Sequence, residues 1–206
     1  MLLATRTTLL LTVTSVCAAM GVGIFLALAK ISKNPIINKP ATAYIFFFRG
    51  TPLLIQLLII YFALPAIDPR LDVGSRFGAA FIAFTMNIAA YLAEIFRAAI
   101  QSIDKGQMEA ARSLGLTYGQ AMRLVIIPQS YRRMIPPVCN EFIMVLKDTA
   151  LVAMIALQDL TYQTKIIASN KASQLVWIPS LLIYLILTAI FTHLFNKLEK
   201  KFSVYE

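Results

Sequence analysis

The chain has 206 residues, of which 59% are hydrophobic and only 14% are charged, and its mean hydropathy is +0.73. These values exclude an ordinary soluble domain and predict an all-α integral membrane protein. The net charge of +9 does not indicate a nucleic-acid partner, because the basic residues lie in short segments beside apolar runs.

Five apolar runs reach the length of about 20 residues that a helix needs to cross a bilayer. They cover residues 7–29, 41–64, 78–100, 135–157 and 176–194. We therefore expect one transmembrane domain over residues 1–206 with five transmembrane helices. In the first run, Gly21 and Gly23 would allow close contact with another helix.

The second and third runs carry polar residues. Arg49-Gly50-Thr51-Pro52 interrupts the second run, and a Gly and a Pro together predict a kink whose freed backbone groups need partners inside the protein. In the third run, Asn87, Tyr91 and Glu94 are spaced by four and three residues, which places them on one helix face. This face is predicted to point into the helix bundle.

The segment between the third and fourth runs, about 104–128, is polar. We expect one short helix over 108–116 that stops at Gly115, a residue suited to a left-handed helix cap. A second short helix over 118–127 is expected to end before Pro128. Two short helices joined by a Gly turn predict a compact knob that another protein can bind.

The fourth run is apolar but contains Asn140, Glu141, Lys147, Asp148 and Thr149. Such residues are costly in lipid, so this helix is expected to face protein and water. We also predict that the helix is discontinuous near residues 147–149. The fifth run is the most apolar and ends in a basic tail.

The distribution of Lys and Arg predicts the orientation, since cytoplasmic loops carry an excess of both. One side of the membrane receives the basic residues after the first run, in the knob and in the tail: Lys30, Lys33, Lys39, Lys105, Arg112, Arg123, Arg132, Arg133, Lys197, Lys200 and Lys201. The opposite loops hold only Arg70, Arg76, Lys165 and Lys171. The knob and the C-terminus are therefore expected in the cytoplasm and the N-terminus outside.

The polar segment also carries a family resemblance. The order Glu109-Ala110-Ala111, Gly115, Val125, Ile127 and Pro128 resembles the EAA loop of ABC-transporter permeases. Four more stretches resemble the polar-amino-acid branch of these permeases (His/Glu/Gln/Arg/opine), and they are Arg49-Gly50-Thr51-Pro52, Ala93-Glu94-Ile95-Phe96-Arg97, Arg133-Met134-Ile135-Pro136-Pro137 and Lys147-Asp148-Thr149. One departure is the short N-terminus, with only Met1–Arg6 before the first run.

The resemblance implies a five-helix type I importer subunit in a bacterial cell membrane that forms a dimer. A homodimer is expected, and a heterodimer with a related permease is the alternative left open. It also implies two ATP-binding subunits, which would hold ATP and magnesium, and an external amino-acid-binding protein. No cofactor and no metal is expected in this chain, because it has no G-x-x-x-x-G-K phosphate loop and no metal-ligand spacing. The expected role is transport of an amino-acid substrate, with ATP hydrolysis by the partner.

Candidate residues fall into three groups. The ATPase-coupling group is Glu109, Ala110, Ala111, Gly115 and Pro128. The substrate pathway is expected to use Glu94, Asn87, Tyr91, Asp159, Asn140, Glu141 and Thr149, with Glu94 and Asp159 taking a positive group. Structural roles are expected for Arg49, Arg97, Lys147 and Asp148. The excess of inward acids favours a basic amino acid such as arginine, lysine or histidine.

Two other classes of function stay open. An ion-coupled secondary amino-acid transporter would use Glu94 or Asp159 as a proton or sodium site, although it usually has more spans or visible repeats. A small channel or membrane scaffold would have no use for the EAA loop. An intramembrane enzyme is disfavoured, because no Ser-His-Asp or Cys-His set emerges from the sequence.

Overall fold

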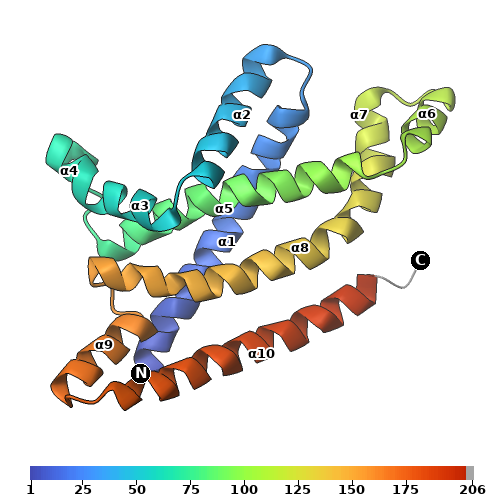
Figure 1. Cartoon of the computed structure of the whole chain (residues 1–206). Coiled ribbons are helices and arrows are strands. Elements are labelled where there is room, and N and C mark those ends of the chain that lie inside the picture. Colours follow the sequence, from blue (N-terminus) through green and yellow to red (C-terminus); the bar gives the residue numbers. More distant parts are fainter. Residues whose placement is uncertain (203–206) are drawn as a thin grey trace.

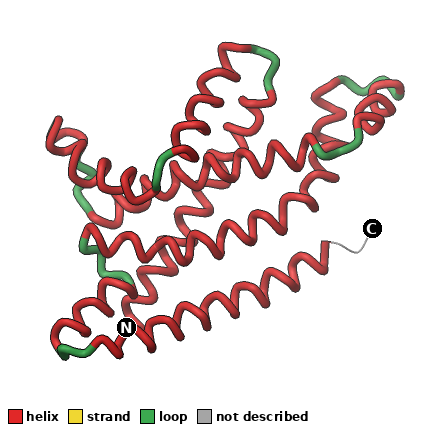
Figure 2. Tube along the Cα trace, in the orientation of Figure 1, coloured by secondary structure: helices red, strands yellow, loops and turns green. Residues whose placement is uncertain are grey.

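The computed structural model describes residues 1–202, and these residues form only helices, turns and loops (Figure 2). The longer helices in chain order are α1 (Leu2–Ile31), α2 (Pro35–Gly50), α5 (Arg76–Gln101), α8 (Ile127–Asp148), α9 (Leu160–Asn170) and α10 (Trp177–Phe202). The shorter helices are α3 (Leu53–Leu58), η1 (Ile59–Ala63), α4 (Leu64–Ile67), η2 (Pro69–Leu71), α6 (Lys105–Ser113), α7 (Tyr118–Ala121), η3 (Met122–Ile126), η4 (Thr149–Ile155) and η5 (Gln174–Val176).

Helix α5 is the centre of the bundle. It packs against α1, α2 and α8, and its inner face is rich in alanine, so neighbouring backbones approach closely (Figure 1). The crossing with α1 is close at Gly23, where an added Cβ would lie 3.0 Å from the Cβ of Leu92. The expected close contact is thus found at Gly23, whereas Gly21 has open space around it.

Three helices within residues 1–202 are long and apolar enough to cross a membrane, and they lie in the first, third and fifth predicted runs. The second run is two helical pieces, Pro35–Gly50 and Leu53–Ile67, which meet at an angle of 102°. The bend predicted in this run is present, but it is so large that the run forms two separate helices and not one kinked helix over 41–64. Pro52 cannot continue the helical hydrogen bonds, and Thr51 and Pro52 form an extended link between the two helices instead.

The fourth run belongs to α8, whose charged residues distinguish it from the apolar spans. Its α-helix ends at Asp148 and continues as the 3-10 helix η4, which confirms the predicted discontinuity at residues 147–149. Helix α8 runs beside α5, and α10 packs along α8 (Figure 1). The knob of α6 and α7 lies at the joined ends of α5 and α8, and α3–α4 and α9 lie toward the opposite ends (Figure 1).

Candidate functional site

The first half of the knob ends as the sequence predicts. Gly115 has a φ of +86°, the left-handed conformation that glycine adopts without strain. The Leu116 N–H donates to the Ala111 carbonyl at 3.2 Å, and the Gly115 N–H donates to the Arg112 carbonyl at 3.0 Å. These two bonds form a Schellman motif, which satisfies the last carbonyls of α6.

The second half begins with a capping box. Thr117 Oγ1 accepts from the Gln120 N–H at 3.3 Å, and Gln120 Oε1 accepts from the Thr117 N–H at 2.8 Å. The helix does not end before Pro128, which corrects the prediction. Pro128 instead stands in the first turn of α8, directly after the wide π-helical turn η3. A π turn relaxes the steric conflict between a proline and the preceding turn, so the chain runs on as a helix.

The knob has one face on the bundle and one face free of it. Ala111 and Ala121 are buried, whereas Glu109 and Ala110 are exposed. Gln129 donates to Gln107 Oε1 at 3.1 Å, and Arg133 donates to the Ser102 carbonyl at 2.5 Å. These two bonds tie the knob to α8 and α8 to the end of α5. Leu114 is 84% exposed at the tip, so the outer face offers both charge and apolar surface.

A second site lies where the two helix breaks meet. A cavity of about 450 Å³ is lined from three directions. The α2–α3 break contributes residues 49–53, α5 contributes Asn87 and Tyr91, and the end of α8 contributes Glu141, Met144 and Asp148. Membrane transporters commonly form their substrate sites at such interrupted helices. The cavity therefore has the position and the polar groups of a substrate site.

Two buried side-chain amides stabilise the α2–α3 break by donating to its backbone carbonyls. Gln56 Nε2 donates to the carbonyls of Phe48 and Thr51, both at 3.0 Å. Asn87 Nδ2 donates to the Phe48 carbonyl and to Gln56 Oε1, both at 3.0 Å. These bonds pair the backbone groups that the break frees, as expected for a helix interrupted inside a membrane. Both N–H groups of Asn87 are thus used by the protein itself.

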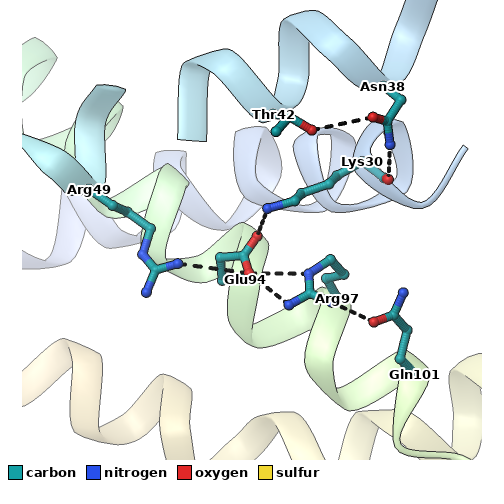
Figure 3. Close-up of polar contacts among 7 residues, drawn as sticks. All are labelled: Lys30, Asn38, Thr42, Arg49, Glu94, Arg97 and Gln101. Atoms are coloured by element: carbon teal, nitrogen blue, oxygen red, sulfur yellow. Dashed lines mark hydrogen bonds and ion pairs between the residues drawn. The ribbon is translucent and has the colours of Figure 1, made fainter. Parts of the chain in front are cut away.

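Glu94 lies one turn beyond Tyr91 on α5, among three basic side chains (Figure 3). Its carboxylate is 2.6 Å from Lys30 Nζ on α1, 2.8 Å from Arg97 Nη2, and 3.8 Å from Arg49 Nη1 on α2. Arg97 also donates to Gln101 Oε1 at 2.5 Å, and Asn38 donates to the Lys30 carbonyl (Figure 3). Glu94 thus joins α1, α2 and α5, and its charge already has partners.

Asp159 has local partners of a different kind. It is fully buried and caps the N-terminus of α9, accepting from the N–H groups of Tyr162 at 2.8 Å and Thr161 at 3.0 Å. The Tyr184 hydroxyl lies 3.5 Å from its Oδ2. The predicted contact of Asp159 with a substrate stays a prediction.

The remaining candidates are spread along α8 and its end. Thr149 is buried and donates to the Leu146 carbonyl at 2.7 Å. Asn140 and Lys147 are exposed, whereas Glu141 and Asp148 line the cavity. Sequence reasoning treated Arg49 and Asp148 as structural, and it did not single out Gln56. The helix-breaking Gly50 and Pro52, four to six residues before Gln56, are the signal that a nearby amide is needed.

Comparison with known proteins identifies the family. Residues 19–204 match the family described as the binding-protein-dependent transport system inner membrane component. The chain belongs to this family. The resemblance to ABC importer permeases that the EAA loop carries is thereby confirmed.

Similar proteins cover nearly the whole chain. The probable amino-acid ABC transporter permease YckA of Bacillus subtilis is 42% identical over 96% of this chain and 87% of its own length. The glutamine transport permease GlnP of Escherichia coli is 36% identical over 97% of this chain and 91% of its own length. A crystal structure of an amino acid ABC transporter with histidines superposes with a TM-score of 0.91 at 41% identity, over 97% of this chain and 92% of that one. An inward-facing methionine transporter shares the fold. Its TM-score is 0.82 at 20% identity, over 98% of this chain and 95% of that one.

Proposed function

We propose that this chain is the membrane permease subunit of an ATP-driven importer for polar amino acids. The proposal is supported by the family, by relatives named for glutamine and L-cystine transport, and by the polar cavity between the two helix breaks. The cavity is the observation that carries the substrate part of the proposal. It combines a guanidinium with two carboxylates, and a free amino acid carries the complementary carboxylate and ammonium.

Energy is proposed to come from a separate ATP-binding subunit that docks on the knob. Glu109 and Ala110 are exposed for this contact, and Gly115 gives the sharp turn between α6 and α7. Because the knob is bonded to α8 and stands directly after α5, movement of the ATPase would pass to the helices that line the cavity. Alternating access follows from that movement.

In the cavity, Arg49 is proposed to hold the substrate carboxylate, with Glu141 and Asp148 facing the ammonium. Two acids against one arginine favour a substrate with an additional positive charge, so arginine, lysine and histidine are the first amino acids to test. Glutamine and cystine, for which relatives are named, carry no net charge and are the natural comparison.

The assembly is proposed to follow from the family. The permease would span the bacterial cell membrane five times, with the N-terminus outside and the second span formed by the bent pair α2 and α3–α4. A second copy of the permease, two ATP-binding subunits and an external amino-acid-binding protein would complete the transporter.

The proposed function is tested by uptake into vesicles that contain the permease with its ATP-binding and substrate-binding partners. Labelled arginine, histidine, glutamine and glutamate are compared, with and without ATP. We expect ATP-dependent uptake of at least one of them. Uptake that persists with an inactivated ATPase partner would instead support an ion-coupled secondary transporter, which family membership does not favour.

A further inference from the structure

Arg49 belongs to two groups of residues at once. It lines the cavity with Glu141 and Asp148, and its Nη1 atom lies 3.8 Å from the carboxylate of Glu94 outside the cavity lining. Its guanidinium carbon also lies 5.3 Å from the centre of the Tyr91 ring, a cation–π distance. The Arg49 side chain is 43% exposed, more than the side chains of Lys30 and Arg97 at 23% and 28%. Arg49 is therefore the accessible cation of the group.

Glu94 does not depend on Arg49 for its position. Lys30 Nζ at 2.6 Å binds one carboxylate oxygen, and Arg97 binds the other through Nη2 at 2.8 Å and Nε at 3.1 Å. Three cations share this one carboxylate, and the contact with Arg49 is the longest of the three. A guanidinium prefers two parallel hydrogen bonds to a carboxylate, and Glu94 does not offer these to Arg49. Releasing Arg49 from Glu94 therefore costs little.

We propose that Arg49 exchanges partners when a substrate enters. In the structure its guanidinium lies between Glu94 and the Tyr91 ring, and with a substrate bound it would bind the α-carboxylate of the amino acid. This inference rests on the proposed function of the cavity as an amino-acid site. Glu94 then competes with the substrate for Arg49 and lowers the affinity without touching the substrate. This role differs from the direct contact with a positive substrate group that the sequence suggested.

The competition has a sign that can be measured. Removing the charge of Glu94 frees Arg49, so the substrate binds more tightly, whereas a direct contact would be lost and the substrate would bind more weakly. Since partly exposed ion pairs contribute up to about 1 kcal/mol, the expected gain for Glu94→Gln is about two- to fivefold in Kd. Arg49→Gln loses a charge-assisted hydrogen bond, and the expected loss is about tenfold or more.

The experiment measures binding of labelled arginine and histidine to the purified permease–ATPase complex in nanodiscs, without the external binding protein. Glu94→Gln is expected to lower Kd, Arg49→Gln to raise it, and the double variant to behave like Arg49→Gln alone. The matched control is Glu199→Gln on α10, which removes one acid away from the cavity and should leave Kd unchanged. If Glu94→Gln does not assemble, Glu94→Asp tests the same direction with a smaller shift, because it keeps the charge for Lys30 and Arg97.

A second comparison isolates the carboxylate. Agmatine and histamine are arginine and histidine without the carboxyl group, and the wild-type complex should bind them more weakly than the amino acids. Arg49→Gln should remove this difference. A Glu94→Gln variant that binds more weakly, or an Arg49→Gln variant that still discriminates against the amines, overturns the exchange. If the wild-type complex instead shows no ATP-driven uptake of any of the four amino acids in vesicles, the proposed function itself is wrong.

Discussion

Two interruptions of helical structure in this chain are satisfied in opposite ways. At Gly115 the last carbonyls of α6 are paired by N–H groups of the next residues, within a stretch of six residues. At Gly50-Thr51-Pro52 the freed carbonyls are paired by the amides of Gln56 and Asn87, and Asn87 is 39 residues from its acceptor Phe48. The knob therefore carries its own turn, whereas the cavity exists only after α2, α3 and α5 have assembled.

The difference suits the two environments. The knob is exposed to water, which hydrogen-bonds any group that a turn leaves free. At the other break Gly50 and Pro52 are exposed, but Phe48 and its partners Gln56 and Asn87 are buried, and an unpaired backbone carbonyl is costly there. A local motif is sufficient for the first, and the second needs side chains from another helix. Substitutions at the two breaks should therefore differ in what they damage.

The largest effect on stability is expected from Gln56→Leu. This variant keeps roughly the same volume but leaves the Thr51 carbonyl and one N–H of Asn87 without their partner, and the Phe48 carbonyl keeps only its bond from Asn87. We expect a loss of about 2 kcal/mol, seen as a lower midpoint of thermal unfolding of the purified permease–ATPase complex. Gln174→Leu is the control, because Gln174 is exposed and its side chain accepts from the nearby Trp177. An equal shift in both variants would contradict the role of the buried amides.

Gly115→Val should damage coupling more than stability. A β-branched residue at φ +86° is strained by about 1–2 kcal/mol, although a Cβ at this position meets no atom within 4 Å. We expect most ATP-driven uptake to be lost while the amount of permease in the membrane is unchanged. Gly21→Val is the matched control, since Gly21 also has open space around it but lies within helix α1, away from the knob. Unchanged uptake with Gly115→Val would count against docking at the knob.

Thr117→Ala should have a smaller and strictly local effect. It removes the hydroxyl that caps α7, which costs about 1 kcal/mol of helix stability. Faster amide hydrogen exchange is expected in residues 118–121, with no change in the residues around Gln56. Thr42→Ala serves as the control, because the Thr42 hydroxyl donates to the Asn38 side chain at 3.4 Å within α2, far from the α7 cap. Faster exchange across the whole bundle would show that the knob is not an independent unit.

The smallest effect is expected from Asp68→Asn. The Asp68–Arg70 pair is 3.4 Å long, and the Arg70 side chain is 91% exposed. An exposed ion pair contributes less than about 1 kcal/mol, and asparagine still accepts a bond from the Arg70 N–H. The unfolding midpoint should therefore match the wild type. A clear decrease in the unfolding midpoint would show that this exposed ion pair stabilises the protein after all.

The same contrast explains what the sequence allows to be predicted. Gly115 and the spacing of Thr117 and Gln120 are local signals, and the turn they form follows from residues within one short segment. The sequence also predicts a bend at residues 50–52, because Gly and Pro interrupt an apolar run. The sequence does not predict the angle of 102° or the partner Asn87, since both depend on how α2 packs against α5.

The role of Glu94 shows the same limit. Its position on a helix face with Asn87 and Tyr91 was predicted, and an acid inside an apolar helix is a reasonable substrate ligand. The partners Lys30 and Arg49 lie on two other helices, and no spacing in the sequence places them beside Glu94. The family is recognisable from motifs, but the ion pairs of Glu94 follow only from the arrangement of three helices.

The tight crossing of α1 and α5 also has a consequence for how the protein is made. The contact at Gly23 joins the first helix to a helix that begins at residue 76, and the Cβ that glycine lacks would lie 3.2 Å from the Ala89 carbonyl. During synthesis, α1 enters the bilayer well before its partner exists. Helix α1 therefore lacks its α5 contact while residues 32–75 are synthesised. The close pairing of α1 with α5 is thus a late event in biogenesis, and it completes the central core only when the third apolar run arrives.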